Sequence, residues 1–235
     1  MLRLAVARVA EVAADGEPAM PGWLGSSERQ RWAQLKPGAR AAFVASRALL
    51  RELLEAATGV DAHAWDVSAQ SGSAPVARAT RRVAAADAIQ VSLSHRLGWV
   101  AAAVAELPVG VDIECERPAR SDAAGRAALM LSPAEISGWQ SIPTDAREAA
   151  LLARWTAKEA WFKASPTGSA PWDFRHVAAR ACTPADANVR TWTAAALHVA
   201  VCCPDAKALS AVRCDGLAAG AQSSSWHVHR VVAAA

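Results

Sequence analysis

The sequence lacks any C-x-x-C pair, although it contains 5 cysteines. An odd number of scattered cysteines predicts neither a disulfide framework nor a zinc knuckle. The sequence also lacks a long uncharged run. Its longest stretches without Asp, Glu, Lys or Arg extend from Thr191 to Pro204 and from Gly216 to His229, well short of the roughly 20 apolar residues that span a bilayer. We therefore expect no membrane helix and no membrane partner.

Basic residues are only slightly in excess, and lysine is scarce. Lys and Arg number 25 against 22 Asp and Glu, a balance too small and too dispersed to indicate a nucleic-acid partner. Only 4 of the basic residues are lysines, and two of them, Lys158 and Lys163, stand close together. A compact ammonium can approach a phosphate or lose its proton, which a guanidinium does not do in the same way. These two lysines are therefore candidate functional residues.

Alanine, in contrast, is abundant. It supplies 60 of the 235 residues, 53% of the chain is apolar, and only 20% is charged. Such a composition excludes intrinsic disorder and allows a buried core without disulfides or a metal. Met1 to Ala10 carries Arg3 and Arg8 inside its apolar stretch, which argues against a secretory signal. We expect a cytoplasmic protein.

Hydrophobic periodicity predicts alternating strands and helices. Ser26 and Ser27 are candidate N-caps of a short basic helix, a helix is expected from Gly38 to Thr58 with Gly59 as its stop, and Ser132-Pro133 indicates a further helix start. Strand patterns occupy residues 2–6, 65–67, 89–93, 98–105 and 109–114. Alternation returns at residues 191–201, and the tail from Ser223 is interpreted as a last strand or a frayed end.

Two basic residues on these elements each allow two interpretations. Arg47 lies on the apolar stripe of the helix from Gly38, where it either snorkels at the edge of the stripe or serves a ligand. His95 belongs to Ser94-His95-Arg96, which we expect to form the turn between two strands. It is either a plain surface residue or a functional one.

The segment Val109-Gly-Val-Asp-Ile-Glu114 carries two acids at alternate positions. If it is a strand, Asp112 and Glu114 share one face, because side chains alternate with period two. One interpretation is a solvated polar face. However, neighbouring like charges repel, and no Lys or Arg occurs from Leu97 to Glu116. A hard divalent cation relieves that repulsion, and Mg²⁺ suits one or two carboxylates with substrate phosphates better than Ca²⁺ or Zn²⁺ does.

The apolar stripe of a long helix from Arg147 to Ala164 includes one acid. Glu159 lies between Trp155 and Phe162 on the inner face, where an unpaired carboxylate must find a cation or take up a proton. Lys163 follows one turn later. A simple Glu159–Lys163 pair would stabilise the helix by roughly a few tenths of a kcal/mol. Such a pair does not explain why lysines occur at both 158 and 163.

These stretches resemble a known family. Val109-Gly-Val-Asp-Ile-Glu114 and Trp155-Thr-Ala-Lys-Glu-Ala-Trp-Phe-Lys163 look like the two signature motifs of the 4'-phosphopantetheinyl transferases, of the Sfp-like monomeric type. Ser92-Leu-Ser-His95 is similar to a third motif. Glu28-Arg29-x-Arg31 and Ser46-Arg47-x-Leu-Leu50 resemble a weaker N-terminal pattern. Two signatures about 45 residues apart in the right order make a specific signal.

The resemblance implies an α+β protein of two similar halves related by a pseudo-twofold axis. Residues 1–106 would form the half on the nucleotide side of coenzyme A, and residues 107–235 the half that binds Mg²⁺ and the carrier protein. The implied reaction transfers the phosphopantetheine arm of coenzyme A to a serine of an apo acyl or peptidyl carrier protein and releases adenosine 3',5'-bisphosphate. Catalysis of this kind depends mainly on positioning and on neutralising charge.

The resemblance also implies roles for particular residues. Asp112, Glu114 and Glu159 would hold the Mg²⁺ on the pyrophosphate. Alternatively, or in addition, Glu159 would accept the serine proton, directly or through water, and Lys163 would stabilise the leaving phosphate. The residues implied to contact the coenzyme are Arg31, Arg47, Pro75, Ser94, His95, Lys158 and Lys163.

The chain departs from the family pattern at three places. Ser73-Ala74-Pro75 stands where Gly-Lys-Pro is usual, so the lysine contact is missing or is supplied by Arg78, Arg81 or Arg82. Arg96 follows His95 where a small hydroxyl residue is common, which would add a phosphate contact. Ala164 to Gly168 replaces a glycine-rich continuation. Two alternatives remain: a Mg²⁺-dependent phosphohydrolase of nucleotides that uses the same acids, and a non-catalytic interaction module with a solvated acidic strand.

Overall fold

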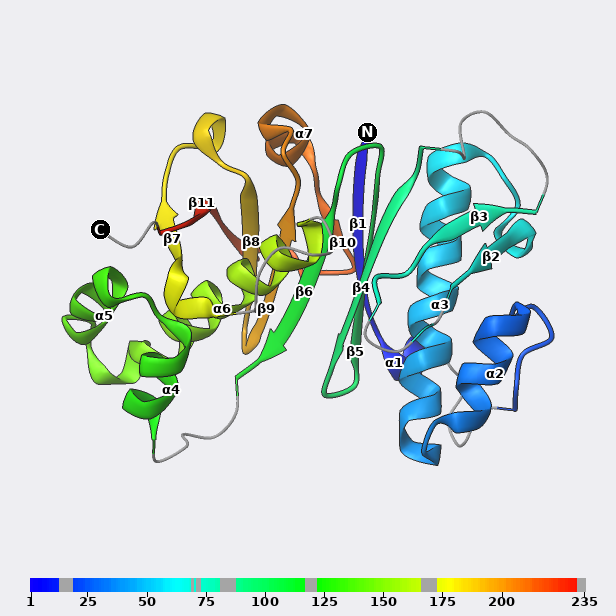
Figure 1. The fold of residues 1–235 in the computed structure, drawn as a ribbon, viewed down its shortest axis with the longest axis horizontal. Helices are drawn as coiled ribbons and strands as arrows, with labels where there is room; N and C mark the ends of the chain where they lie inside the picture. Colours follow the sequence, from blue (N-terminus) through cyan, green and yellow to red (C-terminus); the bar gives the residue numbers. More distant parts are fainter. Residues whose placement is uncertain are drawn as a thin grey trace.

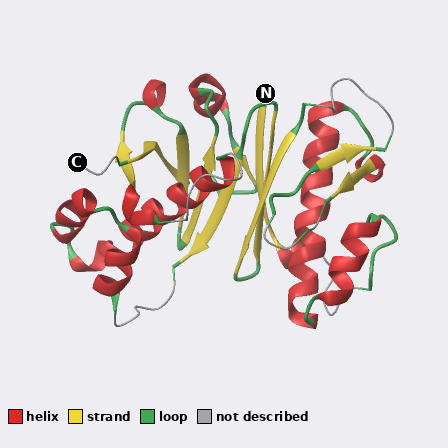
Figure 2. Cartoon of the chain, viewed as in Figure 1, coloured by secondary structure: helices red, strands yellow, loops and turns green. Residues whose placement is uncertain are grey.

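The computed structural model describes residues 1–12, 19–68, 70, 73–80, 88–116, 122–165 and 173–231. Two sheets stand side by side in the middle of the molecule, with helices α2 and α3 on one side and α4 to α6 on the other (Figure 1, Figure 2). The chain is thus α+β, as predicted. No helix in these described ranges is long and apolar enough to cross a membrane.

The first sheet has the order β10-β1-β5-β4. Its strands are β1 (Leu2–Arg8), β4 (Gln90–Arg96), β5 (Trp99–Ala105) and β10 (Cys214–Asp215). β4, β5 and β1 pair in antiparallel fashion, whereas β10 runs parallel to β1. A strand from the C-terminal part of the chain therefore completes the sheet that the N-terminal part begins.

One long helix covers this sheet. α3 (Pro37–Thr58) buries Leu50 and Leu54 completely, at 0% exposure, in a core with the Ala102 face of β5. Gly59 ends the helix with φ of 71°, the left-handed conformation in which glycine carries no steric penalty. Around α3 lie α1 (Val9–Val12), α2 (Ser26–Gln34) and the small antiparallel sheet of β2 (Trp65–Val67) and β3 (Ala77–Ala79).

The second sheet is antiparallel throughout and has the order β6-β9-β8-β11-β7. Its strands are β6 (Gly110–Cys115), β7 (Val177–Ala181), β8 (Val189–Ala194), β9 (Leu197–Cys202) and β11 (Gln222–Arg230). Helix α6 (Arg147–Ala164) crosses its face, and α4 (Ala123–Met130), α5 (Pro133–Gln140) and α7 (Ala206–Ala211) complete this part.

The two sheets meet where β4 lies beside β6. Ser92 of β4 accepts a hydrogen bond from the Val111 backbone N–H at 3.0 Å. Behind this junction, Leu4 of β1, Ala103 of β5 and Ile113 of β6 belong to one buried apolar cluster. The acidic strand is therefore held against both sheets. The predicted division between residues 106 and 107 falls in the connection from β5 to β6.

Several predicted elements are confirmed, and two details are wrong. The helices predicted at 38–58 and 147–164 are present, and so is a last strand after Ser223. Ser94-His95-Arg96 do not form the turn but belong to β4, because the turn is Leu97-Gly98 with positive φ at both residues. A leucine gives no sequence signal for that conformation. The N-cap of α2 is Gly25 instead of Ser26 or Ser27.

Candidate active site

Strand β6 presents Asp112 and Glu114 on the face opposite to its apolar residues. Val111 and Ile113 are 0% and 1% exposed within the core that joins the sheets. Asp112 is itself only 5% exposed. The alternation predicted from the sequence is thus present, but the acidic face is covered and not a solvated surface.

Helix α6 covers that face because Gly110 lets the helix backbone come close. A Cβ atom at Gly110 would lie 1.9 Å from the Ala160 carbonyl oxygen and 2.6 Å from the Ala164 nitrogen. No side chain fits in that space. The contact brings Glu159 and Lys163, which flank Ala160 along the helix, over the acidic face of β6.

Lys163 connects strands of the two sheets. Its Nζ donates to Asp112 Oδ1 at 2.7 Å, to the Val111 carbonyl oxygen at 3.1 Å and to Ser94 Oγ at 3.2 Å. Ser94 Oγ in turn donates to Asp112 Oδ1 at 2.9 Å. The ammonium therefore makes contacts across β4, β6 and α6, which the simple Glu159–Lys163 helix pair does not describe.

Glu159 experiences the charges of both other acids. Burial, and then the negative charges of Asp112 and Glu114, raise the pKa of Glu159 to about 7, although Lys163 opposes the shift. The Oδ2 atom of Asp112 is buried with no hydrogen-bond partner in the described part of the chain. A partly desolvated cluster of carboxylates with an unpartnered oxygen favours a cation or a proton.

The carboxylates of Asp112, Glu114 and Glu159 are not arranged as a complete metal site. Within the described ranges, no three His, Cys, Asp or Glu side chains lie closely enough together to hold an ion as they stand. Asp112 instead pairs with Lys163, and Glu114 Oε2 lies 2.9 Å from Arg96 Nε. Arg96 thus contacts an acid here, whereas the sequence suggested a phosphate contact. A cavity of about 190 Å³ lies beside Glu114, with Trp155 in its apolar wall.

Basic groups gather on the N-terminal side of the acids. The His95 ring is accessible to solvent, yet the surrounding protein and then the positive charges of Arg47 and Lys163 lower its pKa. Burial is the largest cause of a lowered pKa at Arg47, about 10, and Arg31 contributes to it. Lys163, His95, Arg47 and Arg31 are thus close enough for each to influence the next.

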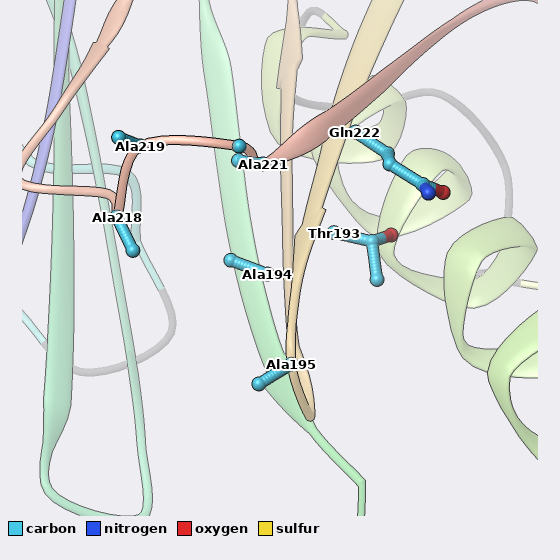
Figure 3. Close-up of a pocket in the computed structure, with 8 residues that line it drawn as sticks. Thr193, Ala194, Ala195, Ala218, Ala219, Ala221 and Gln222 are labelled. Atoms are coloured by element: carbon cyan, nitrogen blue, oxygen red, sulfur yellow. The ribbon is translucent and has the colours of Figure 1, made fainter.

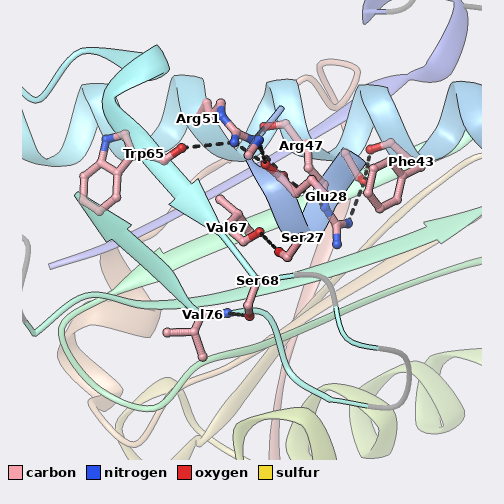
Figure 4. Close-up of polar contacts among 11 residues, drawn as sticks. Ser27, Glu28, Phe43, Arg47, Arg51, Trp65, Val67, Ser68 and Val76 are labelled. Atoms are coloured by element: carbon pink, nitrogen blue, oxygen red, sulfur yellow. Dashed lines mark hydrogen bonds and ion pairs between the residues drawn. The ribbon is translucent and has the colours of Figure 1, made fainter. Parts of the chain in front are cut away.

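Below Arg47, a buried ion-pair network connects α2 to α3 (Figure 4). Arg51 donates to both oxygens of Glu28, at 3.1 and 2.6 Å, and the two side chains are 2% and 0% exposed. Arg51 is not among the residues predicted from the sequence. Its only signal is a second arginine one turn after Arg47 on the apolar side of the helix, where an arginine requires a partner.

Lys158 does not take the predicted role. Its side chain is 0% exposed, and its Nζ donates to Glu135 Oε2 at 2.6 Å, the Met130 carbonyl at 2.9 Å and the Phe174 carbonyl at 3.3 Å. An ammonium has three N–H donors, and all of them are used inside the protein. The predicted contact of Lys158 with the coenzyme is therefore wrong for this structure. Lys158 fastens α6 to α4 and α5.

The loop around Pro75 lies apart from the acids, between β2 and β3. A cavity of about 290 Å³ is lined there by Ala74, Asp66 and Arg78 among others, so of the three arginines proposed to replace the missing lysine, Arg78 lies at the loop. Val76 N–H donates to Ser68 Oγ at 2.8 Å and shapes this loop (Figure 4). Arg81 and Arg82 lie outside the described residues, as does the segment after Ser165 up to Gly168.

A cavity of about 320 Å³ in the second half has a different character (Figure 3). It lies between the β8–β9 turn and the loop that precedes β11, and none of its lining residues is charged: Thr193, Ala194, Ala195, Ala218, Ala219, Gly220, Ala221 and Gln222. With no charged group to bind a phosphate or a metal, this cavity is not the reactive site.

Comparison with known proteins agrees with the geometry. Residues 108–204, which contain β6 and α6, match the family model of the 4'-phosphopantetheinyl transferase superfamily. The chain is also 28% identical over 192 residues to the 4'-phosphopantetheinyl transferase HetI of Nostoc sp. (strain PCC 7120), covering 81% of this chain and 77% of that protein.

Proposed function

We propose that the chain, whose residues 108–204 match the family model of the 4'-phosphopantetheinyl transferase superfamily, transfers the phosphopantetheine arm of coenzyme A to a serine hydroxyl of an apo acyl or peptidyl carrier protein, with Mg²⁺. The other product is adenosine 3',5'-bisphosphate. The observation that carries this proposal is the meeting of Asp112, Glu159 and Lys163 beside β4, with an unpartnered carboxylate oxygen on Asp112.

The acids fit a hard divalent cation. Asp112, Glu114 and Glu159 offer only carboxylate oxygens, the donors that Mg²⁺ prefers together with water and substrate phosphates. The buried Asp112 Oδ2 has no partner of its own in the described ranges, and the raised pKa of Glu159 reflects first its burial and then the negative charges of Asp112 and Glu114. When bound, the ion would neutralise charge on the pyrophosphate of coenzyme A.

The basic residues would hold the phosphates. Lys163 reaches from α6 to Ser94 on β4, so its ammonium lies at the junction of the two halves. His95 and Arg47 continue the positive charge toward the first half. A ligand with a pyrophosphate and a further phosphate is neutralised by such a row of cations, with its nucleotide end toward Arg47 and Arg31.

In the transfer itself, the serine oxygen forms a bond to the phosphorus that carries the pantetheine arm, and the bond from that phosphorus to the oxygen of the nucleotide phosphate breaks. The serine proton goes to Glu159, directly or through water, with this carboxylate acting as general base. Lys163 donates a hydrogen bond to the departing phosphate.

The test is the intact mass of an apo carrier protein incubated with this protein, coenzyme A and Mg²⁺. Transfer adds a phosphopantetheine group of about 340 Da to the carrier serine. An unchanged carrier mass with several different apo carriers would refute the proposal. Release of inorganic phosphate from nucleotides without a carrier would instead support the phosphohydrolase alternative, and absence of Mg²⁺-linked coenzyme A binding would support a non-catalytic module.

A further inference from the structure

Glu28 is a completely buried acid that the proposed reaction does not use. It lies in the first turn of α2, at 0% exposure. Its Oε2 accepts hydrogen bonds from Gly25 N–H at 3.0 Å and from Arg51 Nη2 at 2.6 Å, and its Oε1 accepts from Arg51 Nη1 at 3.1 Å. This two-pronged geometry is the strongest form of an Arg–carboxylate pair.

The two terminal nitrogens of Arg51 are satisfied by these and other acceptors, whereas its Nε has no hydrogen-bond partner in the described part of the chain. Nη2 also donates to the Trp65 carbonyl at 3.1 Å and Nη1 to the Arg47 carbonyl at 3.4 Å, while the Trp23 ring lies 4.7 Å from the guanidinium carbon. Both terminal nitrogens therefore have two acceptors each. The charges of Glu28 and Arg51 balance one another.

Arg47 is less well compensated. Its side chain is 14% exposed, its guanidinium carbon lies 4.4 Å from the centre of the Phe43 ring, and its Nη1 donates to Ser46 Oγ at 3.2 Å. Like the Nε of Arg51, its Nε has no hydrogen-bond partner in the described part of the chain, but it lies 3.7 Å from Glu28 Oε1, whereas Arg51 Nη2 lies 2.6 Å from Glu28 Oε2. The Glu28 carboxylate thus faces the buried Arg51 and the partly buried Arg47, which leaves about one positive charge for an anion.

We propose that Glu28 is a positioning residue: its pair with Arg51 holds α2 against α3 and keeps the Arg47 guanidinium in place for a phosphate of the ligand, without neutralising it (Figure 4). The inference rests on the proposed function, because it takes coenzyme A as that ligand. It adds a residue that acts on binding through Arg47 and touches no ligand atom.

Removing the charge of Glu28 separates two physical effects. If Glu28 acted only as a negative charge near the phosphate site, Glu28→Gln would tighten the binding of coenzyme A, because repulsion is lost. If it positions Arg47, Glu28→Gln would weaken binding, because Arg51 loses its counter-ion and α2 loses its attachment. The sign of the change in Kd therefore distinguishes the two.

The experiment is titration calorimetry of coenzyme A into the full chain with Mg²⁺ and without a carrier protein. We expect Glu28→Gln and Arg47→Gln each to raise Kd roughly tenfold, and the double variant to be little worse than either single one, because both act on the same contact. In transfer assays KM for coenzyme A should rise while kcat at saturation stays similar. Equal or tighter binding by Glu28→Gln, or additive losses in the double variant, would overturn the proposal.

The matched control is a second buried carboxylate. Glu135 pairs with Lys158 at 2.6 Å in the other half, and Glu135→Gln should lower Tm without changing the Kd for coenzyme A. If both variants weakened binding in proportion to their loss of Tm, Glu28 would be merely structural. Where Glu28→Gln does not fold, Glu28→Asp takes its place: it keeps the charge but shortens the reach, and should weaken binding to a smaller extent.

Measurements on the wild-type protein distinguish a failure of the proposed function from a failure of the proposed role of Glu28. If it neither binds coenzyme A nor modifies a carrier, the proposed function itself is refuted. If it does both and the Glu28 variants bind coenzyme A unchanged, only the role of Glu28 is refuted.

Discussion

The acidic cluster and the basic cluster are unbalanced in opposite senses. Around β6 and α6, Asp112, Glu114 and Glu159 share the cations Lys163 and Arg96. Around α2 and α3, Arg47 and Arg51 share the carboxylate of Glu28. One cluster therefore favours an added cation and the other an added anion. A metal–nucleotide ligand satisfies both at once.

The ion pair of Lys158 and Glu135, in contrast, is fully compensated within the protein. There, one ammonium meets one carboxylate and two carbonyls, and all the N–H donors are used. Burial and pairing alone do not mark a functional site. An excess of one sign in a desolvated place, with a polar atom left without a partner, is the more informative feature.

The largest effect is expected at the acidic cluster. Asp112→Asn removes the charge that Lys163 binds and that a metal would need, so carrier modification should fall on the order of a thousandfold, while the circular dichroism spectrum stays unchanged. Glu116→Gln is the control, because Glu116 pairs with His198 at 2.9 Å instead of with Lys163. Substantial carrier modification by Asp112→Asn with added Mg²⁺ would show that the acidic cluster does not need the charge of Asp112.

Glu159→Gln tests the excess of negative charge in the acidic cluster by two measurements. Transfer should fall by roughly a hundredfold or more, since the proposed base is lost. In metal-free buffer at pH 8, however, Tm should rise, because the partly buried carboxylate, with its pKa raised to about 7, is charged there at a cost to the folded state. A lower Tm would show that the carboxylates are already compensated in the protein.

Lys163→Arg keeps the charge and changes its shape. Three acceptors lie within 3.2 Å of one ammonium nitrogen, an arrangement that a planar guanidinium does not reproduce. We expect the rate of transfer to fall about tenfold or more. Wild-type turnover in this variant, measured as carrier modification over time, would show that the reaction does not need an ammonium at position 163.

The smallest effect is expected at the basic cluster. Arg47→Gln should raise KM for coenzyme A about tenfold, the range of one charge-assisted hydrogen bond, with a shallower dependence of binding on salt. Arg175→Gln is the control, because Arg175 forms an exposed pair with Asp173. Equal salt dependence for Arg47→Gln and the wild type would remove Arg47 from the phosphate site.

Much of the acidic cluster follows from local pattern. The alternation around Asp112 and Glu114, and the inward position of Glu159 on its helix, depend only on the periods of a strand and a helix. The boundaries of α3 and α6 follow from the same periodicity and from Gly59 as a stop. Sequence alone therefore determined which acids share a face and which helix carries the third.

The partners were decided by tertiary structure. Lys163 binds Asp112 and Ser94, which lie 51 and 69 residues away in the sequence, although Glu159 is its neighbour one helical turn earlier. Lys158, adjacent to Glu159, is turned into the interior, and Glu28 binds an arginine 23 residues away. Local periodicity sets the direction of a side chain, but the choice among distant partners depends on how the two sheets and their helices pack, and no short stretch of sequence contains that information.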